Sequence, residues 1–99
     1  MSEQTKSTTV TVQNAQGLHM RPAFLIAETA KQFDSKIEMI KGDVRADGKS
    51  ALDILTLGAS QGTEVALEAT GPDASNAIET LQSLFASGFP KKEQTGNPQ

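Results

Sequence analysis

The side chains best suited to chemistry in this chain are His19 and Arg21, which lie within segment 17–23, GLHMRPA. His19 is the only histidine of the sequence. An imidazole exchanges protons near neutral pH and can act as a nucleophile in group transfer. A lone histidine can also be a surface or helix-capping residue, so its neighbours must decide between these interpretations.

The residues after His19 carry the signals of a helix start. Pro22 would fall in the first turn, where the missing proline N–H has no intrahelical acceptor to lose. Apolar residues then recur at helical spacing, at Ala23, Ile26, Ala27, Ala30 and Phe33. We therefore predict a helix over residues 20–33, with His19 at or next to its N-cap.

The predicted helix start is suited to binding an anion. Unpaired N–H groups and about half a positive charge gather at a helix N-terminus. Arg21 falls in the same first turn, and a guanidinium binds phosphate through two parallel hydrogen bonds. An imidazole that attacks phosphorus would leave its dianionic product among these positive groups. The pattern favours a site for a phosphorylated histidine.

Segment 17–23 resembles the active-centre signature of HPr, the histidine-containing phosphocarrier family of bacterial phosphotransferase systems. Further residues lie at the family's spacing from His19: Gly48-Lys49-Ser50, Leu57-Gly58 and Gln61-Gly62-Thr63. No gap is needed between Val10 and Gly88. The resemblance thus covers most of the chain, and its second block at fixed spacing argues against a chance match.

The resemblance implies that His19 accepts a phosphoryl group from a phosphohistidine on enzyme I, which takes it from phosphoenolpyruvate. His19 would pass the group to a histidine on an enzyme IIA domain in sugar uptake. Attachment at Nδ1, stabilisation of the phosphate by Arg21, and binding of its oxygens by the Met20 and Arg21 backbone N–H groups are implied likewise. No cofactor or metal is expected here, since the magnesium belongs to enzyme I. Such a protein is a phosphoryl-transfer co-substrate rather than a turnover enzyme.

The composition of the chain argues against several other classes of protein and site. The chain has 99 residues, 36% of them hydrophobic, which suits one domain with one small core. It has no cysteine, which excludes disulfides and thiolate metal sites. The net charge of −3 argues against nucleic acid as a partner. Polar residues 1–9 and the lack of an apolar run of about 20 residues predict neither a signal peptide nor membrane insertion, so we expect a cytoplasmic protein.

Hydrophobic periodicity switches repeatedly between period two and helical spacing. It predicts strands at 8–13, 36–41, 44–46 and 63–69, and helices at 20–33, 50–57 and 77–85, the last ended by Gly88. The order β-α-β-β-α-β-α predicts a two-layer α+β fold. The resemblance adds an open-faced sandwich with an antiparallel four-stranded sheet, order 1-4-2-3, and three helices on one face. We expect a disordered N-terminus at 1–6, an HPr-like domain at 7–89 and a flexible tail at 90–99, and the resemblance implies a monomer.

Several apolar residues lie off the core stripes of the first two predicted helices. They are Phe24 and Leu25 on the first helix and Leu52 and Leu55 on the second. Single exposed apolar residues are common and need have no function. HPr proteins dock their partners through these helices, so the resemblance implies a docking patch of Phe24, Leu52 and Leu55 beside His19, with Thr56 and Lys31 at its rim.

Ser50 is predicted to be the N-cap of the second helix, because a serine hydroxyl accepts a backbone N–H there. The matching serine of the family is a regulatory phosphorylation site in bacteria that have an HPr kinase/phosphorylase. A phosphate at Ser50 would add a charge of about −1.5 to −2 to the docking face. It would repel an acidic partner more than it would change the fold.

The branch of the family is left open by the sequence. Met20 stands where many sugar-transport HPr proteins have Thr or Ala, and Glu28 and Asp53 are acidic where the enteric sugar-type protein is basic. Segments 68–72 and 84–89 resemble the nitrogen-branch paralogue, NPr, whereas segment 48–50 resembles ordinary HPr. We favour a general HPr slightly, with NPr-type regulation as the alternative.

Two interpretations from other classes remain. In the first, the chain is a non-catalytic α+β interaction module in which His19 is only a helix cap. In the second, it is a small hydrolase, similar to an acylphosphatase, with His19 as base or nucleophile and Arg21 as anion clamp. No second acid–base residue accompanies His19, which disfavours the hydrolase.

Overall fold

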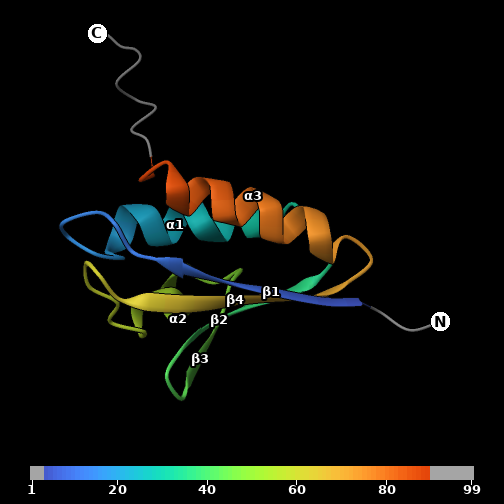
Figure 1. Cartoon of the computed structure of the whole chain (residues 1–99), viewed down its shortest axis with the longest axis horizontal. Helices are drawn as coiled ribbons and strands as arrows, with labels where there is room; N and C mark the ends of the chain where they lie inside the picture. Colours follow the sequence, from blue (N-terminus) through green and yellow to red (C-terminus); the bar gives the residue numbers. More distant parts are fainter. Residues whose placement is uncertain (1–3, 90–99) are drawn as a thin grey trace, which may run out of the picture.

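The structure is a computed structural model that describes residues 4–89, and it places helices against a single sheet (Figure 1). The strands are β1 (Gln4–Thr11), β2 (Lys36–Lys41), β3 (Val44–Asp47) and β4 (Glu64–Gly71). The helices are α1 (Met20–Ala30), α2 (Ala51–Leu55) and α3 (Ala74–Ala86). The predicted order of elements is confirmed.

The sheet has the order β1-β4-β2-β3, and every neighbouring pair is antiparallel. This is the open-faced α+β sandwich that the resemblance implied, with four strands and three helices. In Figure 1, α1 and α3 cover one face of the sheet, and α2 contacts α1 and buries Ile54 in the same core. The strand order could not be derived from periodicity, which carries no information on pairing.

The core lies between this face and the helices. Alternate residues of the central strands point inward and are buried, such as Met39 on β2 and Leu67 on β4, which are paired in register. Ile26 of α1 and Leu81 of α3 meet them from the helical layer. Each such side chain contributes roughly 1.5–3 kcal/mol by leaving water, so this packing holds α1 firmly against the sheet.

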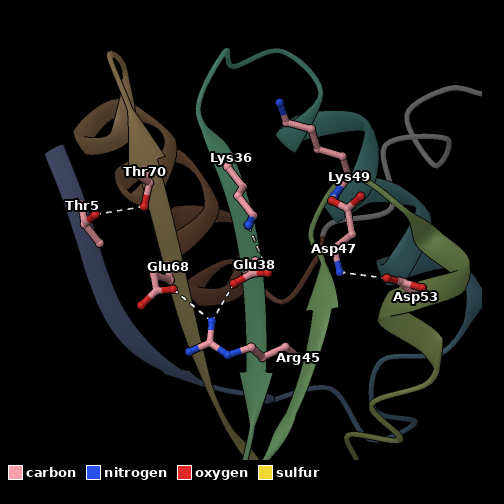
Figure 2. A network of polar contacts seen from close by, with 9 residues as sticks. All are labelled: Thr5, Lys36, Glu38, Arg45, Asp47, Lys49, Asp53, Glu68 and Thr70. Atoms are coloured by element: carbon pink, nitrogen blue, oxygen red, sulfur yellow. Dashed lines mark hydrogen bonds and ion pairs between the residues drawn. The ribbon is translucent and has the colours of Figure 1, made fainter. Parts of the chain in front are cut away.

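The opposite face of the sheet is polar (Figure 2). Glu38 and Glu68 are direct cross-strand partners, an arrangement in which two carboxylates would repel. Arg45 on β3 resolves this, because its Nη1 lies 2.6 Å from a Glu38 oxygen and 3.2 Å from a Glu68 oxygen. The hydrogen bonds to Glu68 and then to Glu38 raise the pKa of Arg45. The outer face of the sheet thus carries a charged cluster that is exposed to water.

Some predicted boundaries are corrected. We expected disorder at residues 1–6, but β1 already begins at Gln4, which pairs with Gly71 at the far end of β4. The long partner strand orders residues 4–6, and a local polar composition does not reveal that. Residues 1–3 and the predicted tail at 90–99 lie outside the described part of the chain. The first helix ends at Ala30 rather than Phe33, because the Phe33 N–H bonds to the Ala30 carbonyl in a tighter turn.

Candidate functional site

His19 is the N-cap of α1, as the sequence predicted. Its backbone is extended, with φ −86° and ψ −163°, and its carbonyl accepts the Ala23 N–H at 3.0 Å. The imidazole makes no capping hydrogen bond and is half-buried. The N–H groups of the first turn have no acceptor within the helix, so they are available to an anion beside the ring.

The loop before His19 is held by contacts that the sequence motif does not explain. Gly17 has a left-handed φ of +71°, and a Cβ there would lie 2.5 Å from the Ala59 carbonyl oxygen. The neighbouring Leu18 is buried and donates its N–H to the same oxygen at 2.9 Å. Only glycine fits so close to this backbone. The glycine of the signature therefore sets where the chain enters α1, and so where His19 lies.

Asn14 is a second feature of this loop, and sequence reasoning missed it. Its amide Nδ2 donates to the Gly17 carbonyl, while the Gly17 N–H donates to the Asn14 carbonyl at 3.0 Å. Asparagine is common in turns because its side chain bonds nearby backbone groups. That preference, together with a position just before a helix start, was the available signal.

Arg21 lies in the first turn of α1 and reaches the other end of the chain. Its Nη2 donates to the Phe89 carbonyl oxygen at 2.6 Å. Phe89 is buried, and its ring packs edge-to-face on Phe85 with centroids 5.0 Å apart. The sequence predicted Arg21 as a phosphate ligand but did not predict its contact with the Phe89 carbonyl. An aromatic residue directly after the helix-ending Gly88 was the only local signal.

The predicted docking residues lie on two helices that pack together, α1 and α2, or at the C-caps of these helices. Of these residues, Phe24 is 54% exposed and Leu52 71%. Met20, which was not predicted to dock a partner, is 59% exposed, and all three side chains are large and apolar. We call these three residues the apolar patch. Met20 and Phe24 are four positions apart, so they share one face of α1 next to His19. Exposure of this kind on neighbouring helices is unusual unless another surface covers it.

The other three predicted docking residues differ from one another. Leu55 is half-buried and packs on the core, so it offers only part of its side chain to a partner. Thr56 is exposed, and its hydroxyl donates to the Asp53 carbonyl at 2.6 Å. Lys31 is exposed and lies 3.3 Å from Glu28, an ion pair that is weak at this exposure.

Ser50 is the N-cap of α2, as predicted. Its Oγ accepts the Asp53 N–H at 3.2 Å, and the Asp53 carboxylate in turn accepts the Asp47 N–H at 3.0 Å (Figure 2). The Lys49 ammonium donates to the Phe33 carbonyl at 2.7 Å and so ties the start of α2 to the segment after α1. The Ser50 hydroxyl therefore bonds to the backbone of Asp53, whose carboxylate is held by the Asp47 N–H.

The comparisons with known proteins agree with this geometry. Residues 6–87 match the family described as the PTS HPr component phosphorylation site. The chain belongs to the HPr family. It is 38% identical to phosphocarrier protein HPr of Treponema pallidum over 81 residues, which cover 82% of this chain and 92% of that protein. It is 34% identical to phosphocarrier protein NPr of Escherichia coli over 83 residues, covering 82% and 91%.

A solved HPr structure shares the fold. HPr-C-His of Thermoanaerobacter tengcongensis has a TM-score of 0.83 and 41% identity over 87% of this chain and 97% of its own. The protein is thus an HPr-type phosphocarrier of the phosphotransferase system. Relatives named HPr and NPr thus match this chain at similar identity.

Within residues 4–89, no group of three or more His, Cys, Asp or Glu side chains is arranged to hold a metal ion. None of the described helices is both long and apolar enough to span a membrane.

Proposed function

We propose that His19 carries the phosphoryl group, taking it from a phosphohistidine of enzyme I and giving it to a histidine of an enzyme IIA domain in sugar uptake. The observation that supports this most is the position of His19. Its ring stands at the N-terminus of α1 without a capping hydrogen bond, and Arg21 lies in the same turn. Both features serve a dianion on the ring, and neither is needed to cap the helix.

The transfer can be written with its bonds balanced. The His19 Nδ1 lone pair attacks phosphorus, a P–N bond forms, and the P–N bond to the donor imidazole breaks with its electron pair leaving on that imidazole. In the second transfer the lone pair of an acceptor histidine attacks phosphorus, and the P–N bond to His19 breaks with its electron pair returning to Nδ1. Such chemistry needs positioning and charge stabilisation more than proton transfer. The Met20 and Arg21 N–H groups and the Arg21 guanidinium supply both.

The apolar patch is the proposed docking surface for enzyme I and the IIA domains. Leu52 and Phe24 can bury against a partner and bring its histidine beside His19. Partners of this kind act in the cytoplasm, and we place the protein there. Leu55, Thr56 and Lys31 complete the rim of the surface.

The NPr-type alternative has a specific observation in its favour. Glu28 on α1 and Asp53 on α2 put carboxylates on the two docking helices. Acidic residues here would disfavour a partner with an acidic surface, because complementary charge steers encounter. A nitrogen-branch IIA partner is the second candidate acceptor.

Ser50 is the proposed regulatory site. The Ser50 Oγ bonds to the backbone N–H of Asp53 in the first turn of α2, so a phosphate there would add to the negative charge that Asp53 gives the docking face. An HPr kinase/phosphorylase would be the modifying partner. We expect this modification to weaken docking rather than to remove the His19 site.

The test is phosphorylation in solution. The protein is incubated with phosphoenolpyruvate, magnesium and the host enzyme I, and its intact mass is measured without acid, with His19→Ala beside it. We expect one acid-labile phosphate on the wild type and none on the variant. The phosphorylated protein is then mixed with sugar-branch and nitrogen-branch IIA domains, and the one that gains phosphate faster names the branch. A folded wild type that stays unphosphorylated with active enzyme I would support the interaction module instead.

A further inference from the structure

Lys41 is a charged residue on the side of the sheet that faces the helices. It is the last residue of β2, and by the alternation of the strand it shares a face with Ile37 and Met39, which are buried in the core. Lys41 itself is half-buried. A lysine in such a place lays its apolar stem along the core and brings its ammonium to polar groups. The groups that it reaches show what the residue does.

The ammonium of Lys41 bonds to the turn that follows α2. Its Nζ donates to the Leu57 carbonyl at 3.0 Å and to the Gly58 carbonyl at 3.4 Å. The N–H groups of the same two residues fold back onto the helix, where they bond to the Ile54 and Leu55 carbonyls in turn. The N–H groups thus close the last turn of α2, while the two carbonyls point away from the helix to Lys41.

The residue after this turn makes the contact on which the His19 loop rests. Ala59 is buried, and its carbonyl oxygen accepts the Leu18 N–H at 2.9 Å. The same oxygen is the atom that a Cβ at position 17 would meet at 2.5 Å. Its place depends on the direction in which the chain leaves Gly58, whose carbonyl Lys41 holds. A path of backbone and hydrogen bonds therefore runs from Lys41 to the residue before His19.

The turn after α2 depends on such a bond because little else restrains it. The helix α2 has five residues, and isolated helices shorter than about 12–15 residues are marginal in water. Gly58 has a left-handed φ of +61°, and nothing lies within 4 Å of the place where its Cβ would be. A hydrogen bond from a charged donor is stronger than one between neutral groups. Lys41 therefore restrains the turn at a point where packing does not.

We propose that Lys41 is a positioning residue of the phosphoryl site, whose ammonium restrains the turn after α2 and, through the Ala59 carbonyl, fixes the loop that sets the position of His19. The role rests on the proposed function of His19. Without the ammonium, residues 57–59 gain freedom and the Leu18 N–H loses a fixed acceptor. His19 then leaves its place at the start of α1 for part of the time. Transfer slows as a result, because a misplacement of about 1 Å can cost about 100-fold in rate.

The first arm of the test is kinetic. Lys41→Met keeps the apolar stem and removes the donors, so we expect it to lower kcat for phosphorylation by enzyme I about threefold or more. KM should change little, because Phe24 and Leu52 of the apolar patch are untouched. Lys41→Arg, which restores a charged donor, should recover most of the rate. Lys36→Met is the matched control, since it makes the same change on the same strand but beside Glu38 on the outer face (Figure 2). Its kcat should equal that of the wild type.

A second control breaks a bond of the same kind at the other end of α2. The Lys49 ammonium donates to the Phe33 carbonyl at 2.7 Å, and this bond does not lead to Ala59. Lys49→Met should therefore lower the stability of the protein, as Lys41→Met does, but leave kcat unchanged. If both variants lower kcat alike, the loss comes from a loosened α2 and the positioning role is overturned. Should Lys41→Met not fold by circular dichroism, Lys41→Gln, whose side chain is shorter and uncharged, carries the same expectation.

The second arm follows the path in the unphosphorylated protein by amide hydrogen exchange. The Leu18 amide reports on its bond to the Ala59 carbonyl, and the amides of the central strand β4 report on global unfolding. In Lys41→Met the Leu18 amide should exchange about tenfold faster than the change at β4 accounts for. In the two control variants Leu18 and β4 should change together. A double variant with Gly17→Ala should lose less kcat than the product of the two single losses, because both changes act on the same contact.

The outcomes separate this inference from the function beneath it. An unchanged kcat in Lys41→Met, a Leu18 amide that exchanges no faster than β4 accounts for, or losses that multiply in the double variant would each overturn the positioning role while His19 is still phosphorylated. A wild type that takes no phosphate would overturn the proposed function and, with it, any role of Lys41 in transfer. The exchange of the Leu18 amide would then still decide whether Lys41 fixes the loop.

Discussion

Asp73 and Ser35 are joined at the junction of α3 with the segment before β2: the Asp73 carboxylate accepts the Ser35 N–H at 2.9 Å and the Ser35 hydroxyl at 2.5 Å. The second carboxylate oxygen accepts the Asp34 N–H at 2.9 Å. The Ser35 hydroxyl first, and the Asp34 N–H next, lower the pKa of Asp73 from its ordinary value of 3.8. Ser35 is itself buried, so this carboxylate fixes the turn where the helical layer meets the sheet.

A pH dependence of stability follows. Because the pKa of Asp73 is lower in the folded state, the unfolded chain binds the proton more readily, and stability falls as pH drops below 3.8 through the folded-state value. Above pH 3.8 the stabilising contribution of the ionised Asp73 carboxylate is fully present. We expect Asp73→Asn to be less stable than wild type at neutral pH and to lose part of this acid dependence. Urea unfolding of both proteins across this range checks it, and parallel curves would contradict it.

Gly17 yields a prediction about the loop that positions His19. Gly42 has a similar left-handed φ, +58° against +71°, but open space where a Cβ would be, whereas a Cβ on Gly17 would meet the Ala59 carbonyl. We expect Gly42→Ala to cost about 1–2 kcal/mol, the price of the conformation. Gly17→Ala should cost about 1–3 kcal/mol more because the backbone must move. Denaturant unfolding measures both, and equal losses would show that the close approach is unimportant.

Gly17→Ala should also slow phosphorylation. The Leu18 N–H bonds to the carbonyl that the new methyl would displace, so His19 would shift relative to the first turn of α1. We expect a lower kcat/KM with enzyme I in Gly17→Ala and an unchanged value in Gly42→Ala. The assay is run where both variants are folded. A normal rate in Gly17→Ala would mean that the loop does not set the position of His19.

Two variants of Ser50 distinguish its structural role as a helix cap from the proposed regulatory effect of a phosphate. Ser50→Ala removes the acceptor of the Asp53 N–H and should lower the free energy of unfolding by about 1 kcal/mol. Ser50→Asp keeps a capping oxygen and adds a negative charge beside Asp53. We therefore expect Ser50→Asp to be more stable than Ser50→Ala but to bind enzyme I more weakly. Thermal unfolding and titration calorimetry report the two quantities, and equal affinity in both variants would remove the electrostatic argument.

A substitution at Phe24 tests whether the apolar patch is the docking surface. Phe24→Asp should raise the Kd for enzyme I about tenfold or more, because a charge would be buried where an aromatic ring packs. Val44→Asp is the matched control, since Val44 is also a large exposed apolar residue but lies on β3, away from α1. Its Kd should stay at the wild-type value. If the two variants bind alike, the patch is not the docking surface.

The sequence by itself predicted the order of the elements and the positions of the candidate site residues at the helix starts. Pro22 and the apolar stripe from Ala23 place the start of α1, and Ser50 marks the start of α2, because caps and stripes depend on residues within a turn or two. The same signals predicted His19 at the N-cap of α1 and Arg21 in its first turn, where the structure has them. The strand order came from a family resemblance, since alternation shows which face is buried and not which strand is the neighbour.

Only the tertiary structure decided the relationships between distant segments. Gln4 is ordered because it pairs with Gly71, and Arg21 is held because Phe89 returns to it from the end of α3. The Ala59 carbonyl likewise decides why position 17 must be glycine. Each of these contacts joins residues more than 40 positions apart, and they form only when the core has brought their elements together. Local sequence preferences act over a few residues and therefore carry no record of such contacts.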